Sequence, residues 1–194
     1  MWTLRQSSPF VGLALLAAMT TGCAVTRPEQ ADRGEQVPIE EFLHEHLHAQ
    51  PMVTVAEAYR AMVLLADGDD TYDSFAAREQ ALTERGIARP AWKLTREACI
   101  DRGAVAYMVC KILRIRSGVN FTLLGSLGVG DRRYAVRELA YLDLLDSMPP
   151  YRYMSGAELV DLLGKADAYM AKEGLYEEEP VDFVETLDAA DTGP

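Results

Sequence analysis

Apolar residues recur at intervals of three and four positions along most of the segment from residue 39 to residue 172. This spacing is typical of α-helices that bury one face, because about 3.6 residues make one helical turn. We therefore predict a single, mainly all-α domain over residues 39–172. The predicted helices run from 54 to about 66, from about 74 to 85, from 101 to about 113, from about 135 to 146 and from 155 to about 170.

Capping signals mark the starts of several of these helices. Thr54 and Ser155 are each followed three positions later by a glutamate, and such a pair forms a capping box that satisfies free backbone amides. Asp101 is a similar cap for the third helix. The cap positions 54, 101, 135 and 155 each follow an apolar residue, which resembles a repeat. Their unequal intervals exclude a strict solenoid, and good helix starts look alike in any case.

One segment lacks the helical pattern. Residues 119–124 are β-prone, and glycines follow at positions 125, 128 and 130. The pattern allows either a small β-hairpin near 119–127 or a packed loop. We do not expect a phosphate-binding loop, because the glycines have the wrong spacing and no Lys-Ser or Lys-Thr pair follows them.

Charge narrows the classes of partner. The 194 residues carry a formal net charge of −11. Nucleic-acid binding needs a basic surface for the phosphates, so we expect no nucleic-acid partner. The segment 173–194 is acidic and contains no lysine or arginine, and we predict a disordered tail there. A short docking turn built on Val181, Phe183, Val184 and Leu187 stays open as an alternative.

The N-terminus carries the strongest single signal in the sequence. An early cation, Arg5, precedes an apolar run over residues 10–19, and small residues then lead to Cys23. A membrane-spanning helix needs about 20 apolar residues, so this shorter run indicates an export signal over residues 1–22.

The sequence around Cys23 resembles the lipobox of bacterial lipoproteins. Gly22 and Cys23 fit that motif, whereas Thr20 stands where the family usually has leucine. The resemblance implies that Cys23 carries lipid and begins the mature chain, which makes the lipid bilayer a partner. In that family, Ala24 in place of aspartate implies a periplasm-facing position on the outer membrane of a diderm organism. An ordinary cleaved signal peptide is the alternative. We predict a polar tether over residues 23–38.

Cys99 and Cys110 form an even pair, which in an oxidising compartment suggests a disulfide. Cys99 precedes the helix that Asp101 caps, and Cys110 lies about nine residues into it. At ~1.5 Å per residue their Cα atoms are roughly 13 Å apart, whereas a disulfide requires less than about 7 Å. We therefore predict two buried free thiols.

Two further motifs resemble the S-layer homology family. Gln80 to Ile87 is similar to the family's helix that ends in Gly-Ile, and Ile100 to Met108 is similar to its helix opening of the type Ile-Thr-Arg-Ala/Gly-Glu. The resemblance is best over residues 52–115 and looser over 134–170. It implies an all-helical fold in which a helix, an irregular loop and a second helix alternate.

The resemblance also implies a function for one arginine. In the family, the arginine of this motif helps to bind carbohydrate polymers attached to peptidoglycan, and Arg102 stands at that position. Ala104 replaces the family's glutamate, and Val55, Val136 and Gly156 stand at the arginine position of the other helix starts.

The loop before Arg102 carries Trp92 and Lys93. Aromatic rings stack on sugars, and cations donate hydrogen bonds to them. Trp92, Lys93 and Arg102 are therefore the candidate ligand-binding residues. The alternative for Trp92 is that it fills a gap between helices.

All the histidines of the chain, His44, His46 and His48, lie in one short segment. Imidazoles bind zinc and copper, so this cluster is a candidate metal site. On a strand all three histidines would share one face, whereas on a helix His44 and His48 would share a face and His46 would point elsewhere. The glutamates at 40, 41 and 45 make a solvated amphipathic helix, with Phe42 and Leu43 inward, the alternative. The acidic run 67–73 has the spacing of the start of a calcium loop but not its central glycine or closing glutamate, and we predict a capped turn there.

No Gly-x-Ser-x-Gly motif occurs, and the histidines all lie near the predicted tether. We therefore expect a non-catalytic protein without a cofactor. The leading hypothesis is a lipid-anchored binding or scaffolding module of the cell envelope that recognises a cell-wall polymer through Trp92 and Arg102. The alternatives are a periplasmic metal-handling protein that uses the histidine cluster and an adaptor that binds another envelope protein.

Overall fold

The computed structural model describes residues 25–115 and 130–176. Within these ranges the chain forms helices joined by loops, and its β-type pairing is confined to isolated bridges. This confirms the predicted all-α class. No helix of the described ranges combines the length and the apolar character needed to cross a bilayer. The predicted leader over 1–22, the hairpin near 119–127 and most of the predicted acidic tail lie outside the described residues.

The predicted helices are present, and others precede them. The helical elements are, in chain order, α1 (Pro28–Gln36), α2 (Ile39–Glu41), the π-helix η1 (Phe42–Leu47), α3 (Val55–Asp67), α4 (Phe75–Glu84), the 3-10 helix η2 (Pro90–Trp92), α5 (Arg102–Ile112), α7 (Asp131–Tyr141) and α8 (Gly156–Glu173). Side chains of Thr54, Ser74, Asp101 and Ser155 cap α3, α4, α5 and α8. Both predicted capping boxes are formed.

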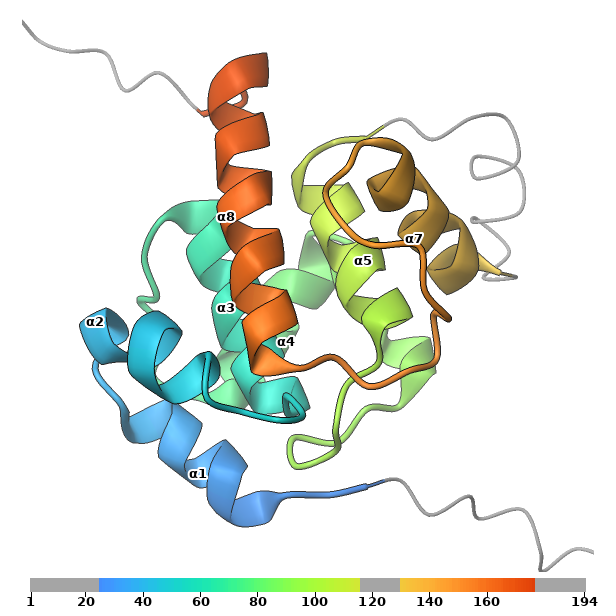
Figure 1. Ribbon diagram of the computed structural model, residues 1–194. Helices are drawn as coiled ribbons and strands as arrows, with labels where there is room; N and C mark the ends of the chain where they lie inside the picture. Colours follow the sequence, from blue (N-terminus) through green and yellow to red (C-terminus); the bar gives the residue numbers. More distant parts are fainter. Residues whose placement is uncertain (1–24, 116–129, 177–194) are drawn as a thin grey trace, which may run out of the picture.

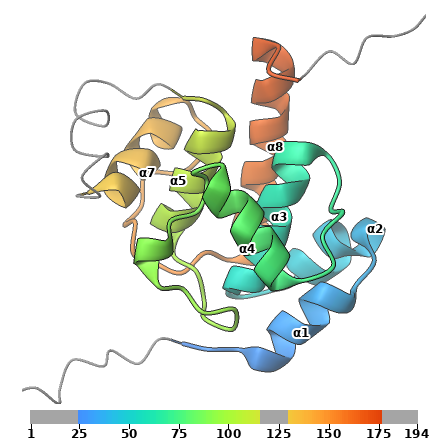
Figure 2. The same cartoon turned by 180° about the vertical axis from the view of Figure 1, so that it is seen from behind.

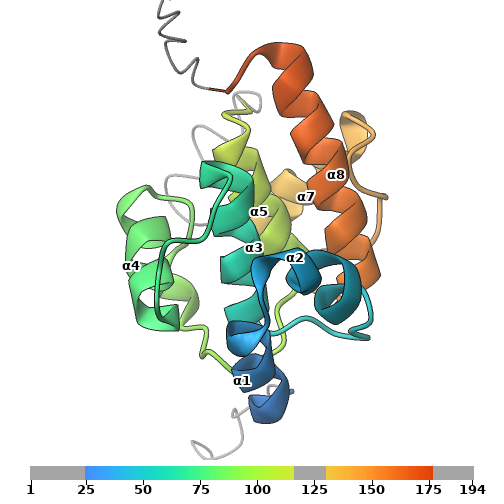
Figure 3. The same cartoon turned by 90° about the vertical axis from the view of Figure 1, so that its left-hand side faces the viewer.

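Helix α3 lies at the centre of the body and contacts α1, α4, α5 and α8 (Figure 1). Figure 3 shows α4 on one side of α3 and α8 on the other. Every residue from Val55 to Val63 is buried, and so is every residue of α5 from Arg102 to Cys110. Helix α7 packs on the outer side of α5, away from α3 (Figure 2).

The segments that precede α3, α5 and α8 are joined by a closed cycle of backbone hydrogen bonds. The amide of Val53 donates to Met154 O (2.9 Å), that of Met154 to Ile100 O (3.0 Å), and that of Ile100 to Val53 O (2.9 Å). Each of these residues directly precedes a helix cap, and all are fully buried. The cycle brings the N-terminal ends of α3, α5 and α8 together. Within the described ranges, η1–α3, α4–α5 and α7–α8 are therefore helix–loop–helix units that meet at one point.

The prediction of a polar tether over 23–38 is wrong for residues 28–36, which form α1 and pack on α3. Pro28 occupies the start of this helix, where its missing amide is not needed. Its buried face consists of Ala31 and Gly34, so it has almost no hydrophobic signal in the sequence. Nη1 of Arg60, on α3, donates to the carbonyl oxygens of Gly34 (2.7 Å) and Val37 (2.7 Å).

The predicted boundaries of the helix at 135–146 also differ from the structure. Helix α7 begins at Asp131, after Gly130 in the left-handed region (φ 75°), so position 135 is not a helix start. It ends at Tyr141, because Asp143 takes a positive φ (57°). Leu144 and Leu145 stay buried beyond that turn. Their apolar character extended the predicted helix past its real end.

Candidate functional site

Trp92 lies at the end of η2 and packs against α5. Its ring meets that of Tyr107 edge-on, with the ring centroids 5.2 Å apart and the planes at 81°. The guanidinium carbon of Arg132, from α7, lies 4.7 Å from the centroid of the Trp92 ring. Trp92 is thus partly buried between α5 and α7, as the gap-filling interpretation predicted, and the neighbouring Lys93 is exposed.

Cations surround this aromatic pair. Arg89 donates from Nε to the hydroxyl of Tyr107 (2.8 Å), and its guanidinium carbon lies 4.7 Å from the ring centroid. Nζ of Lys111 lies 5.4 Å from the same centroid. Such cation–aromatic contacts each contribute about 0.5–1 kcal/mol when partly exposed. We call this set the Trp92 surface: Arg89, Trp92, Lys93, Tyr107, Lys111 and Arg132.

Two carboxylates face these cations. Arg132 pairs with Asp101, the cap of α5, and Nη1 of Arg89 lies 3.4 Å from Oδ2 of Asp131. Burial raises the pKa of the Asp101 carboxyl, while the Ala104 amide and Arg132 oppose that shift. The basic side chains of the Trp92 surface outnumber these acidic partners. The Trp92 surface thus brings four basic side chains together on a protein whose formal net charge is −11.

Arg102 does not belong to the Trp92 surface, which corrects the candidate set of Trp92, Lys93 and Arg102. Arg102 is only 1% exposed. Nη2 donates to Asp146 O (3.1 Å), and Nη1 lies 3.5 Å from Oε1 of Glu158. Burial lowers the pKa of the Arg102 guanidinium, and Glu158 opposes that shift. The side chain lies under the loop before α8 and holds α5 to α8, so it has a structural role.

The three histidines do not form one cluster. His46 is buried, whereas His44 and His48 are exposed. The π-helical turn, in which the His48 amide donates to Leu43 O (3.3 Å), places His46 against α3. Its Nε2 lies 2.6 Å from Oε1 of Glu57. Among the described residues, no group of three or more His, Cys, Asp and Glu side chains is arranged to hold a metal ion.

Glu57 is the centre of a buried polar network that joins α1, η1 and α3. It accepts hydrogen bonds from the amide of Thr54 (2.8 Å), the hydroxyl of Thr54 (2.8 Å) and Nε2 of Gln30 (2.7 Å), besides its contact with His46. Gly34 of α1 passes so close that a Cβ there would lie 2.8 Å from Cγ of Glu57. The sequence identified Glu57 as a capping residue but not as the residue that binds α1.

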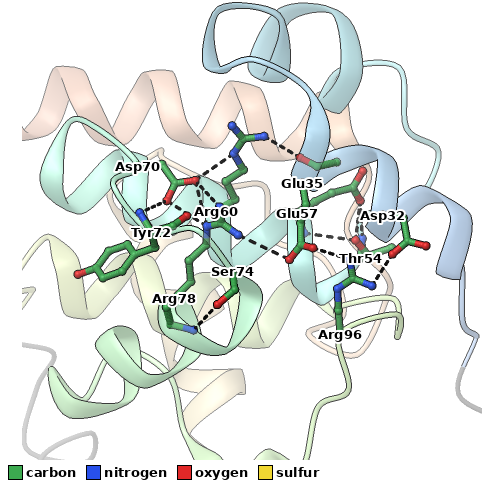
Figure 4. Close-up of polar contacts among 12 residues, drawn as sticks. Asp32, Glu35, Thr54, Glu57, Arg60, Asp70, Tyr72, Ser74, Arg78 and Arg96 are labelled. Atoms are coloured by element: carbon green, nitrogen blue, oxygen red, sulfur yellow. Dashed lines mark hydrogen bonds and ion pairs between the residues drawn. The ribbon is translucent and has the colours of Figure 1, made fainter.

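The acidic run 67–73 forms the predicted capped turn. Gly68 ends α3 in the left-handed region (φ 77°). The side chain of Asp70 is buried and lies between two arginines, Arg60 (3.1 Å to Oδ2) and Arg78 (2.8 Å to Oδ2). Figure 4 shows this group together with Arg96, which pairs with carboxylates of α1. The carboxylates of Asp70, Asp32 and Glu35 thus already form ion pairs with arginines.

Two hollows occur in the described part of the chain. One, of about 440 Å³, is polar and lies beside α1 and His46. The other, of about 890 Å³, lies where α3 and α5 end, beside the C-terminal half of α8. The lining of this second hollow combines apolar with charged residues: Leu64, Leu65, Ile112, Met170 and Leu175 beside Asp67, Arg85, Lys111, Arg114 and Asp167. Neither Trp92 nor Arg102 lines either hollow, but Lys111 belongs both to the Trp92 surface and to the lining of the second hollow.

Cys99 and Cys110 are free and buried, as predicted. Burial raises the pKa of the Cys110 thiol to about 12 and raises that of Cys99 as well. A thiol with such a pKa is protonated at neutral pH and is therefore a poor nucleophile.

Comparison of the chain with models of protein families, with curated proteins and with solved structures finds no match.

Proposed function

We propose that the protein is a lipid-anchored, non-catalytic binding module of the cell envelope, and that its Trp92 surface binds an anionic cell-wall polymer. The observation that carries this proposal is the position of Trp92 and Tyr107 among the side chains of Arg89, Lys111 and Arg132. The protein as a whole has a formal net charge of −11. A local excess of cations on an acidic protein attracts an acidic ligand to one place rather than to the whole surface.

The chemistry of the Trp92 surface suits a sugar polymer that carries carboxylate or phosphate groups. The exposed Lys93 supplies an ammonium group, and the planar guanidinium of Arg132 can bind a carboxylate or phosphate through two hydrogen bonds. The partly exposed ring of Trp92 offers an apolar edge for a sugar. The resemblance to the S-layer homology family supports a wall polymer as the ligand. Because Arg102 is buried, Arg132 supplies the guanidinium next to Trp92.

The lipobox around Cys23 supports the anchor, and the fold adds a geometrical consequence. The carbonyl of Val25 accepts from the Cys99 amide (2.8 Å), and the Arg27 amide donates to Glu97 O (2.8 Å). The folded body therefore begins two residues after Cys23. A lipid on Cys23 would hold the body directly at the bilayer. In this proposal the protein is a short link between membrane and wall.

A sedimentation assay with isolated sacculi tests the ligand. We expect the Trp92→Ala and Lys93→Glu variants to bind sacculi at least tenfold more weakly, equivalent to about 1.4 kcal/mol. Lys165→Glu is the matched control, because Lys165 is also exposed but lies on α8 beside Asp161. Arg102→Met should bind like the unchanged protein. Equal binding by the Trp92 and Lys93 variants, or no binding by any form, would refute this ligand.

Lipidation is tested separately in the host. Radiolabelled palmitate should be incorporated into the unchanged protein and should be absent from a Cys23→Ser variant, which should leave the membrane fraction. Unlabelled protein, or a Cys23→Ser variant that stays with the membrane, would contradict the anchor without affecting the sacculus result.

A further inference from the structure

Helix α1 lies at the edge of the body and buries little apolar surface against it. Figure 3 shows α1 at the lower end, below α2 and α3. Of its nine residues, only Ala31 and Gly34 are buried. The buried side chains of α8 are, by contrast, Leu159, Leu162, Leu163, Ala166 and Met170. Hydrophobic stabilisation grows with the apolar area removed from water, so it contributes much less to the docking of α1 than to that of α8.

Polar and ionic contacts hold α1 instead. Arg96, from the loop before α5, pairs with both Asp32 and Glu35. Arg60 donates to two carbonyl oxygens at the C-terminal end of α1. The side chains of Arg96 and Asp32 are 26% and 60% exposed, so dissolved ions reach this pair and screen it. Because exposed ion pairs stabilise a fold only weakly, the attachment of α1 is expected to be weak and sensitive to salt.

The interface of α1 also contains buried acceptor atoms that no donor in the described ranges satisfies. Oε1 of Gln30 and Oε1 of Glu35 are buried without a hydrogen bond, and Nη1 of Arg78 lies 3.6 Å from the latter. Beside them, the hollow of about 440 Å³ is lined by residues of α1 together with His46 and Gln50. Water satisfies such acceptors once the helix leaves. Detachment of α1 therefore recovers part of the free energy that its lost contacts cost.

We propose that residues 25–37 form a strap that detaches from the body as one unit while the other helices stay folded. The strap consists of α1 and the residues before it, which pair with residues 97–99 through two backbone hydrogen bonds. The hydrogen-bond cycle that joins the starts of α3, α5 and α8 includes no residue of the strap. Helix α3 also packs against α4, α5 and α8. The body therefore keeps its core when the strap leaves.

Release of the strap changes the reach of the body. In the docked state the carbonyl of Val25 is bound by the Cys99 amide, and Cys23 precedes Val25 by two residues. At ~3.3 Å per extended residue, release of the strap allows Cys23 and Pro38 to lie up to roughly 50 Å apart. Detachment itself does not depend on a lipid, but this consequence rests on the proposed anchor at Cys23. With that anchor, the docked strap keeps the body at the bilayer and the released strap lets it extend toward the wall.

Hydrogen exchange of the full chain, followed by mass spectrometry of overlapping peptides, tests the detachment. We expect the amides of residues 31–37 to exchange at least tenfold faster than those of residues 55–63, because the strap opens without unfolding of the body. Raising the salt concentration from about 0.05 M to about 1 M, where the screening length falls to about 3 Å, should accelerate exchange in 31–37 at least threefold and leave 55–63 unaltered. Equal exchange in the two segments, or no response to salt, would overturn the proposal.

The Gly34→Ala variant distinguishes detachment from fraying of a docked helix. Alanine raises the helix propensity of α1, but a Cβ at this position would lie 2.8 Å from Cγ of Glu57. A helix that only frays would therefore exchange more slowly in this variant, whereas a strap that is pushed off the body exchanges faster. We expect faster exchange of residues 31–37, with no change in residues 55–63. Slower exchange of residues 31–37 would overturn the proposal.

The Arg96→Gln variant removes the cation that pairs with α1, and it should accelerate exchange of residues 31–37 at least threefold at low salt. Arg85→Gln is the matched control, because Arg85 also pairs with a carboxylate, that of Asp67 (2.7 Å), but does not contact α1 through this pair. It should leave residues 31–37 unchanged, and equal effects of the two variants would overturn the proposal. A negative result here leaves the palmitate result at Cys23 standing. Absence of palmitate from Cys23 would instead remove the consequence for reach without altering the exchange rates.

Discussion

Glu57 and Glu158 occupy the same position in two capping boxes, yet their surroundings differ. Glu57 is 1% exposed and is contacted by Gln30 and His46 in addition to its cap. The side chain of Glu158 is 25% exposed and pairs with Arg152. Although partial burial raises the pKa of Glu158, hydrogen bonds from Ser155 and Arg152 hold it below its ordinary value. Both glutamates thus cap a helix, but Glu57 also joins its helix to α1 and η1.

This comparison predicts different costs for the same substitution. Glu57→Ala should lower the free energy of unfolding by about 3 kcal/mol, because it leaves buried donors of Thr54 and Gln30 without an acceptor. Glu158→Ala should lower it by about 1 kcal/mol, the usual value of a lost cap interaction. Urea unfolding followed by far-UV circular dichroism measures both. Equal losses for the two variants would show that the Glu57 network adds nothing beyond capping.

The buried cysteines give a second prediction at this scale. Burial raises the pKa of the Cys110 thiol to about 12, so its reactive thiolate is scarce at pH 8 and the side chain is also inaccessible. We expect iodoacetamide to leave Cys99 and Cys110 unmodified in the folded protein and to modify both in urea. Mass spectrometry of the peptides that contain them provides the readout. Rapid modification of Cys110 without urea would contradict its burial on the face of α5 that packs against α7.

At the scale of a single helix, α8 contains two glycines with opposite requirements. A Cβ on Gly156 would lie 1.7 Å from Leu47 O, whereas a Cβ on Gly164 would have no neighbour within 4 Å. Gly156 also donates its amide to Gln50 O (2.8 Å), so the start of α8 touches the loop before α3 directly. Gly156 is therefore needed for a close approach of two backbones, and Gly164 is not.

We predict opposite effects of alanine at these two positions. Gly164→Ala should stabilise the protein by about 0.5–1 kcal/mol, because alanine has the higher helix propensity. Gly156→Ala should destabilise it by about 3 kcal/mol, because the backbone around Leu47 has to move. The midpoints of thermal unfolding of the two variants, compared with that of the unchanged protein, measure both effects. A stabilising Gly156→Ala would mean that α8 does not approach residue 47 in solution.

The helices that the sequence predicted well are those with a cap and an apolar stripe in the same stretch of chain. Thr54, Asp101 and Ser155 start α3, α5 and α8 as expected. Helix α1 has neither signal, because small residues make its buried face and arginines from distant segments hold it. Arg96, for example, pairs with Asp32 across more than sixty positions of sequence. Such a contact has no local pattern and cannot be predicted from spacing.

The same limit applies to the candidate site. Trp92 and Lys93 could be selected from residue type alone, since an aromatic ring and a cation stand side by side in a loop. Arg132 could not, because it reaches Trp92 from another helix. Arg102 was placed in the site by its position in a motif, but a motif does not say what covers a side chain. The loop before α8, which accepts its hydrogen bonds, lies more than forty positions away.

At the scale of the whole molecule, the hydrogen-bond cycle of Val53, Ile100 and Met154 links the starts of α3, α5 and α8. We expect this link to make the helices unfold together. The helix–loop–helix units of the described ranges share this point and the core around α3, so none of them can lose its contacts without exposing residues of the others. A single shared core of this kind is expected to unfold in one cooperative step. Separate domains would unfold in separate steps.

We therefore predict coincident unfolding curves from two probes. In a chain that begins at Cys23, Trp92 is the remaining tryptophan, because Trp2 lies in the predicted leader. Its fluorescence reports the packing of η2 against α5 and α7, while circular dichroism at 222 nm reports all helices. The two urea curves should have the same midpoint. Met154→Ala, at a fully buried position before α8, should shift both by an equivalent of about 3 kcal/mol. If the fluorescence midpoint stayed in place while the dichroism curve split into two steps, the units around α3 would be independent, and the cycle that joins their helix starts would not operate in solution.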